Sequence, residues 1–313
     1  MNKPTLLIVN NFDPPTIKIL DAAYTTHKLW VTRDKAEREE LLSSIAPHCT
    51  ALASGNFANA KLINSLPNLK MIANFSVGTD GIDLALAKEK HIKVSNTPDV
   101  LNDEVADLGI ALMLAAQRQL VTSDKFVRDG LWLKQRMPFG RSLKGKILGI
   151  VGMGRIGEEV AKRALAFKMN IAYHNRHQKD VPYQYFENLL ELAKYSDVLL
   201  NVLPSTVETK KLIDQEILRA LGSDGTFINI GRGDTVDQDA LIEALQTNEI
   251  AAAGLDVYIN EPKVPAELIA LPNVVLTPHI GSATLETRAA MGKLVIDNLD
   301  AYFKQRPLLT PVI

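Results

Sequence analysis

The sequence is poor in cysteine, since Cys49 is the single example among 313 residues. One thiol excludes an intrachain disulfide and is typical of a protein that stays in a reducing compartment inside the cell. An excess of charge of either sign is also absent, because 35 Lys and Arg residues nearly balance 36 Asp and Glu residues. The net charge of −1 gives no electrostatic reason to expect nucleic acid or an anionic membrane as a partner.

Long hydrophobic runs are missing as well. The longest, LGIALMLAA at residues 108–116, covers about half of a membrane span. The short apolar run near the start, TLLIVN, does not reach the length of a signal-peptide core. We therefore expect a cytoplasmic globular protein that binds neither membrane nor nucleic acid.

What is present is enough apolar sequence, 46%, to build two domains of about 150 residues each. In the first third of the chain, short strand-like runs alternate with helix-like segments such as 34–45. Strands that alternate with helices indicate a parallel sheet covered on both faces. The expected strands in this part are residues 5–10, 27–31, 49–54, 71–76 and 92–96.

A second α/β pattern begins after Pro98, which breaks regular structure. Helices are expected at 102–119 and 122–129, and a last helix at 283–304. The expected strands of this part are residues 146–151, 170–174, 197–202, 226–230, 251–256 and 273–277. The sequence thus predicts two doubly wound α/β domains, Rossmann-like and flavodoxin-like. We expect one domain of 1–98 plus 284–313 and a second of 99–283.

The segment KILGIVGMGRIG carries three glycines at the spacing G-x-G-x-x-G, between a buried strand and a helix. Gly152 permits a tight turn, Gly154 lets a pyrophosphate approach the backbone, and Gly157 lets helix and strand pack closely. The anion would lie at the helix N-terminus, beside Arg155 and Ile156. A glycine turn without a ligand is the alternative, but the strand before it and the helix after it favour a dinucleotide site.

The residues that follow the next strand lack the expected acid. An NAD-binding protein usually carries there a carboxylate that binds the adenosine ribose. This chain has Asn175 and Arg176 instead, which can donate to a 2′-phosphate. A hydrogen bond to a charged group contributes about 1.5–3 kcal/mol, so the sequence predicts a preference for NADP(H), with NAD(H) as the second cofactor. A solvated arginine is the alternative, and His174 and His177 alone make too few ligands for a metal site.

Three further segments fall where parallel strands should end: NIGRGDTVD, AGLDVYINEP and TPHIGSAT. Ligands of doubly wound sheets bind at the carboxyl ends of the strands, so an arginine, an acid and a histidine should meet there. An arginine can clamp a carboxylate and polarise the neighbouring carbonyl. A histidine can give or take the alcohol proton, and a carboxylate beside it fixes its tautomer.

With these motifs the chain resembles the D-isomer-specific 2-hydroxyacid dehydrogenases. It is most similar to the branch of glyoxylate/hydroxypyruvate reductases and hydroxyphenylpyruvate reductases. The resemblance runs nearly from end to end, through six motifs in the family's order: FSVGTDGID, LNDEVADLGIAL, VGMGRIG, NIGRG, GLDVYINEP and PHIGSAT.

The resemblance implies that 1–98 plus 284–313 is the substrate domain and 99–283 the dinucleotide-binding domain, with the active site in the cleft between them. It also implies roles for individual residues. Arg232 would bind substrate, His279 would be the acid/base, and Glu261 its partner. The alternatives are a turn residue, a helix cap and a solvated loop acid, respectively. Asp256 would lie near the nicotinamide carboxamide, or would simply satisfy backbone donors. The substrate contacts implied in the first domain are Ser54, for which a turn is an equal explanation, and the backbone at Val77 and Gly78.

The resemblance also implies a homodimer in which the arm around Trp132 either packs in the interface or reaches the neighbouring active site. The expected activity is NADPH-dependent reduction of a small 2-oxo acid, such as glyoxylate or hydroxypyruvate, to a D-2-hydroxy acid. A hydroxyphenylpyruvate reductase or another dehydrogenase of this family is the alternative. A more distant alternative is a nicotinamide-sensing protein, similar to the transcriptional corepressors that share the fold.

Overall fold

The structure, a computed structural model, describes residues 3–313 and divides them into two compact units. The first unit contains the chain up to Leu101 together with Ala283–Ile313, and the second is Asn102–Ser282. The first boundary therefore lies three residues after the predicted one, and the second lies one residue before it. Both ends of the second unit adjoin long helices, α5 (Asn102–Gln117) and α12 (Leu285–Phe303).

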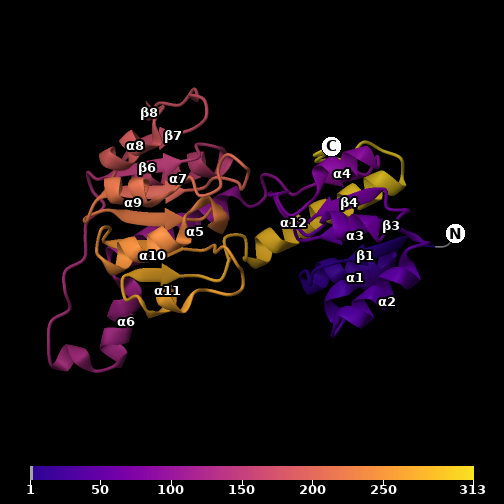
Figure 1. The fold of residues 1–313 in the computed structure, drawn as a ribbon, viewed down its shortest axis with the longest axis horizontal. Helices are drawn as coiled ribbons and strands as arrows, with labels where there is room; N and C mark the ends of the chain where they lie inside the picture. Colours follow the sequence, from indigo (N-terminus) through magenta and orange to yellow (C-terminus); the bar gives the residue numbers. More distant parts are fainter. Residues whose placement is uncertain (1–2) are drawn as a thin grey trace. The chain divides into compact units, whose positions relative to one another are not determined.

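The first unit is built on a five-stranded parallel sheet in the order β2-β1-β3-β4-β5 (Figure 1). This is the flavodoxin-like order. All strands are parallel, and the direction in which successive strands are added across the sheet reverses between β1 and β3. The strands are β1 (Thr5–Ile8), β2 (Thr25–Lys28), β3 (Cys49–Ser54), β4 (Met71–Asn74) and β5 (Lys93–Ser95).

Helices cover both faces of this sheet. On one face, Leu52 and Ile72 pack against residues of α2, α3 and α4, among them Ile63 and Ala87. On the other, α12 packs on α1 and β4. The close fit depends on Gly292, where a Cβ would lie 1.8 Å from Thr16 Oγ1. The helices are α1 (Pro14–Ala23), α2 (Lys35–Ile45), α3 (Ala60–Asn64) and α4 (Leu84–Glu89).

One predicted strand is wrong in its bounds. Residues 27–31 were expected to be extended, but β2 ends at Lys28 and Leu29–Val31 form a short 3₁₀ turn. The turn is closed by Thr32, whose amide and hydroxyl both donate to the carbonyl of Leu29. A local side-chain bond of this kind competes with strand pairing and is hard to foresee from hydrophobicity.

The second unit contains a seven-stranded parallel sheet in the order β12-β11-β10-β9-β6-β7-β8. When β6 is counted as the first strand, β8-β7-β6-β9-β10-β11 follows the strand order of dinucleotide-binding folds, and β12 is one further strand at the edge. The strands are β6 (Ile147–Val151), β7 (Asn170–His174), β8 (Gln184–Phe186), β9 (Val198–Asn201), β10 (Thr226–Asn229), β11 (Ala252–Leu255) and β12 (Val274–Leu276). β8, an edge strand of three residues, was not predicted.

The helices of the second unit lie on both sides of its sheet (Figure 1). α5 packs against α7, β10 and β11, while α8, α9 and α10 contribute Leu192, Leu218 and Leu241 to the core on the other face. Within residues 3–313, no helix combines the length and the apolar character needed to cross a bilayer. The remaining helices are α6 (Leu120–Arg128), α7 (Arg155–Ala166), α8 (Leu189–Tyr195), α9 (Gln215–Leu221), α10 (Gln238–Gln246) and α11 (Ala266–Ala270).

Candidate active site

The three glycines of the loop between β6 and α7 differ in what surrounds them. Gly152 has a φ of 106°, which an L side chain rarely adopts. A Cβ on Gly157 would lie 2.3 Å from the carbonyl oxygen of Gly152, so helix and turn approach too closely for a side chain. Around Gly154, by contrast, a Cβ would meet nothing within 4 Å. The fold itself thus requires Gly152 and Gly157, while Gly154 leaves open space at the helix N-terminus.

That open space suits the phosphates of a dinucleotide. Gly154 is the N-cap of α7 and has no side chain with which to cap the N–H groups of the first turn, in which Arg155 and Ile156 lie. Other helices of the chain are capped by side chains, such as Asp214 on α9 and Asp237 on α10. A helix N-terminus left open to a ligand is a favourable place for an anion. The residues present therefore fit the predicted cofactor.

Asn175, at the end of β7, holds this glycine loop in place. Its Oδ1 accepts a hydrogen bond of 2.7 Å from Met153 N, and its Nδ2 donates to Met153 O over 3.3 Å. The Asn175 carbonyl in turn accepts from the Tyr185 hydroxyl. Asn175 thus has a positioning role that the sequence analysis missed, and one amide hydrogen is left for a ligand. Arg176 beside it is exposed to solvent.

Arg232 lies in a turn after β10 whose two flanking glycines are required by packing. A Cβ on Gly231 would lie 2.6 Å from Leu203 O, and one on Gly233 would lie 2.1 Å from the Tyr258 carbonyl carbon. The Arg232 carbonyl accepts a hydrogen bond of 2.6 Å from Thr235 Oγ1. The backbone of Arg232 is therefore held firmly, while its half-buried side chain donates from Nη1 to Gly231 O.

His279 and Glu261 form a hydrogen-bonded pair. His279 Nδ1 lies 2.6 Å from Glu261 Oε2, and the other carboxylate oxygen accepts from Tyr258 N over 2.9 Å. Both side chains are partly open to solvent, 47% for His279 and 33% for Glu261. Because Glu261 engages Nδ1, the Nε2 atom of His279 is the one available for proton exchange with a substrate.

The electrostatics of Glu261 link the pair to Arg232. Burial opposes ionisation of the carboxyl group, but the hydrogen bonds from His279 and Tyr258 and the charges of His279 and Arg232 outweigh it. The net result is a pKa of Glu261 below its usual value. Glu261 is therefore a carboxylate at neutral pH.

Asp256 holds the loop that carries His279. It is 2% exposed, and its carboxylate accepts hydrogen bonds from Thr277 Oγ1 (2.7 Å), Ile280 N (2.8 Å) and Gly281 N (2.9 Å). Burial raises its pKa despite these bonds. Asp256 thus satisfies backbone donors, and its place near the nicotinamide carboxamide stays a prediction. Its bonds fix the turn in which His279 adopts a φ of 53°.

Of the substrate contacts predicted in the first unit, the loop at Val77 and Gly78 has the right chemistry. Asn96 Nδ2 donates to Val77 O over 3.0 Å, and Asn74 Nδ2 donates to Gly78 O over 2.8 Å. Across residues 3–313, the N–H groups of Val77 and Gly78 have no hydrogen-bond partner. Successive free N–H groups attract anions. Asn74 and Asn96 were missed, although Asn96 closes one strand-like run of the sequence and Asn74 lies within another.

Ser54 is different. It is fully buried, and its hydroxyl accepts a hydrogen bond of 2.6 Å from Phe57 N. The structure therefore favours the turn interpretation of Ser54 over a substrate contact through its hydroxyl.

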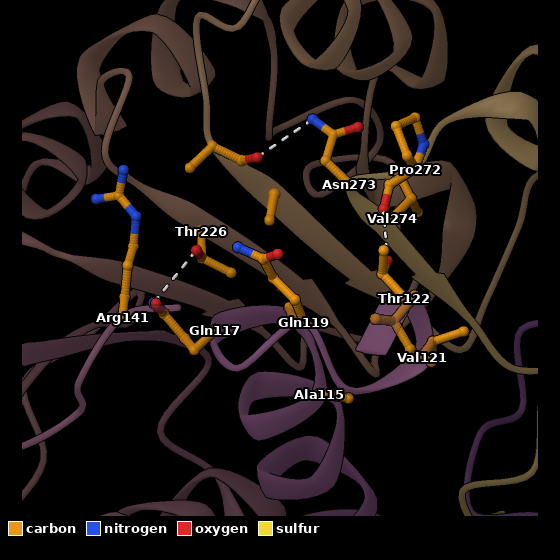
Figure 2. Close-up of a pocket in the computed structure, with 14 residues that line it drawn as sticks. Ala115, Gln117, Gln119, Val121, Thr122, Arg141, Thr226, Pro272, Asn273 and Val274 are labelled. Atoms are coloured by element: carbon orange, nitrogen blue, oxygen red, sulfur yellow. Dashed lines mark hydrogen bonds between the residues drawn. The ribbon is translucent and has the colours of Figure 1, made fainter. Parts of the chain in front are cut away.

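A pocket of about 280 Å³ in the second unit lies away from these residues (Figure 2). It is lined by the first residues of β10, β11 and β12, at the sheet edge opposite to the one that carries Arg232 and His279. Gln117 Nε2 donates to Thr226 Oγ1 there, and Thr122 Oγ1 donates to Pro272 O. The pocket does not belong to the candidate active site.

The carboxyl edge of the seven-stranded sheet thus carries a glycine turn, an arginine and a histidine–carboxylate pair, on a fold whose strand order is that of dinucleotide-binding proteins. This combination is typical of oxidoreductases that use a nicotinamide dinucleotide. Residues 110–281 match the family model described as D-isomer specific 2-hydroxyacid dehydrogenase, NAD binding domain. The chain belongs to this family of enzymes.

Relatives of known name agree with this assignment. The chain is 45% identical to glyoxylate/hydroxypyruvate reductase A of Arabidopsis thaliana, over 94% of each chain. It is 44% identical to hydroxyphenylpyruvate reductase of Plectranthus scutellarioides, again over 94% of each. Among solved structures it is similar to an NADPH-dependent glyoxylate/hydroxypyruvate reductase of Sinorhizobium meliloti in complex with NADP and malonate. That structure shares 39% identity over 99% of this chain and 97% of its own, with a TM-score of 0.92.

Proposed function

We propose that the protein reduces small 2-oxo acids, glyoxylate and hydroxypyruvate foremost, to 2-hydroxy acids with NADPH, giving the D-isomer where the product is chiral. The observation that carries the proposal is the His279–Glu261 pair beside Arg232 at the cofactor edge of the sheet. The names of the relatives support the same substrates. Hydroxyphenylpyruvate is the second candidate substrate, because the relative named for it is nearly as similar.

In this proposal each residue has one task. Bound NADPH supplies the hydride that the carbonyl carbon receives. The Arg232 guanidinium binds the substrate carboxylate and polarises the carbonyl. His279 Nε2 donates a proton to the carbonyl oxygen, and the Glu261 carboxylate keeps the imidazole oriented through its bond to Nδ1. The N–H groups of Val77 and Gly78 are proposed to bind a carboxylate group.

The cofactor preference is proposed to depend on Arg176. Replacing Arg176 by alanine should lower the ratio of kcat/KM with NADPH to kcat/KM with NADH by about tenfold to a hundredfold, because a charged hydrogen bond to the 2′-phosphate is lost. Initial rates with each nucleotide measure this ratio. Arg219→Ala is the matched control, since Arg219 is an exposed arginine of the same unit that pairs with Glu249. An unchanged ratio in Arg176→Ala would place cofactor selection elsewhere.

We further propose that the protein is a cytoplasmic homodimer. The segment after α6 exposes large apolar side chains: Trp132 is 71% exposed, Leu133 93% and Phe139 99%. Burying such side chains in an interface is favourable. Light scattering should give twice the mass of one chain, and Leu133→Ser with Phe139→Ser should shift the protein toward the monomer. A wild-type protein that stays monomeric at high concentration refutes this proposal.

A further inference from the structure

Two asparagines and a threonine lie buried beside the turn that carries Arg232. Asn201 ends β9 and Asn229 ends β10, and the two residues pair with each other across the sheet. Thr235 comes three residues after Arg232 and ends a short 3₁₀ turn. Asn201 and Thr235 are fully buried, and Asn229 is 2% exposed. Buried polar side chains are costly unless they form hydrogen bonds, so these three must bond to one another or to the backbone.

Their hydrogen bonds meet at the backbone carbonyl of Arg232. Asn201 Nδ2 donates to Asn229 Oδ1 over 3.0 Å and to Thr235 Oγ1 over 2.7 Å, which uses both hydrogens of this amide. Because Thr235 Oγ1 accepts from Asn201, its own proton is available for the Arg232 carbonyl, 2.6 Å away. Asn229 Nδ2 donates to the same carbonyl over 3.2 Å. One connected network of side chains therefore supplies two hydrogen bonds to the backbone of Arg232.

The same network holds the residue before Arg232 and the loop that packs on it. Asn229 Oδ1 accepts a second bond from Gly231 N over 3.1 Å, and Asn201 Oδ1 accepts from Leu203 N over 3.3 Å. The loop after β9 contacts the turn here, since a Cβ on Gly231 would lie 2.6 Å from Leu203 O. Hydrogen bonds are stronger in a low-dielectric interior, and a satisfied buried network makes the backbone that it contacts rigid.

We propose that Asn201 and Thr235 are positioning residues, which fix the backbone of Arg232 so that its guanidinium is held where it binds and polarises the substrate. This inference rests on the proposed function, because it concerns the placement of the arginine to which that function assigns substrate binding. Misplacing a binding group by about 1 Å can cost about a hundredfold in rate. A positioning residue therefore affects turnover even where the protein stays folded.

The test is the kinetics of Thr235→Val with hydroxypyruvate and NADPH. Valine is close to threonine in shape but has no hydroxyl, so the Arg232 carbonyl loses its shortest hydrogen bond. We expect kcat/KM to fall by about tenfold to a hundredfold, while the Kd for NADPH changes by less than about threefold. Thr235→Ser keeps the hydroxyl and should recover most of the loss. Thr226→Val is the matched control, since this buried threonine begins β10 and bonds to Gln117 at the opposite edge of the sheet.

The Arg232→Ala background separates positioning from stability. If Thr235 acts through the arginine, Thr235→Val should change kcat/KM by less than about threefold once the guanidinium is gone. An equal loss in both backgrounds overturns the proposal, and so does a Thr235→Val enzyme with a lower melting temperature but wild-type kinetics. A wild-type protein that consumes no NADPH with hydroxypyruvate or glyoxylate would instead refute the proposed function itself. If Thr235→Val does not fold, Asn201→Ala is measured in the same two backgrounds, and the same outcomes decide.

Discussion

Replacing His279 by alanine is expected to lower kcat for hydroxypyruvate by about a hundredfold to ten-thousandfold, the contribution of a general acid. The Kd for NADPH should change little, because the glycine loop and Asn175 that shape the predicted cofactor site make no bond to His279. Stopped-flow turnover and a fluorescence titration of NADPH measure the two quantities. A lost affinity for NADPH, with turnover restored at saturating cofactor, would mean that His279 is structural.

The chain offers a matched control for this variant. His91 is an exposed histidine outside the site, and its φ of 54° is nearly that of His279. Alanine at either position bears the cost of a left-handed backbone, so His91→Ala reproduces the conformational part of the substitution. We expect it to retain wild-type turnover.

Replacing Arg232 by alanine should have the second large effect. Two charged hydrogen bonds of about 1.5–3 kcal/mol each would be lost, so kcat/KM should fall by at least about a hundredfold. Both a higher KM and a lower kcat are expected, because the guanidinium would bind the carboxylate and also polarise the carbonyl. Steady-state kinetics with hydroxypyruvate measure both.

The fold should survive this change. The backbone carbonyl of Arg232 accepts the hydrogen bonds that hold the turn, from Thr235 Oγ1 and Asn229 Nδ2, and alanine keeps that carbonyl. A melting temperature near that of the wild type would confirm this point. Kinetics that stay at the wild-type level would remove Arg232 from the site.

Much of this site could be predicted because it follows from topology. Parallel strands end at one edge of a sheet, so the residues that follow β6, β10 and β12 must lie along that edge. This placement does not depend on the conformations of their side chains. The G-x-G-x-x-G spacing indicated a tight glycine turn between strand and helix for a related reason, since Gly152 and Gly157 are required by backbone geometry. The two-domain α/β fold also follows from alternating strands and helices.

The contacts that sequence reasoning missed depend on side-chain geometry. Asn175 was assigned only to the cofactor, yet its amide is paired with the backbone of Met153, which is 22 residues earlier in the chain. Asn74 and Asn96 were not singled out, although their side-chain amides donate hydrogen bonds to the carbonyls of the Val77–Gly78 loop. Whether a polar residue at a strand end faces the backbone or a ligand is decided by its rotamer and its neighbours, and neither can be read from spacing.

Turnover of NADPH with glyoxylate or hydroxypyruvate separates this protein from a binding protein that only senses nicotinamide nucleotides, because such a protein binds NADPH without consuming it.

The most direct test is the consumption of NADPH after hydroxypyruvate is added to the purified protein. The account predicts continuous oxidation of NADPH, with one D-glycerate formed for each NADPH consumed. It would be contradicted by a protein that binds NADPH but consumes none with hydroxypyruvate, glyoxylate, pyruvate or hydroxyphenylpyruvate.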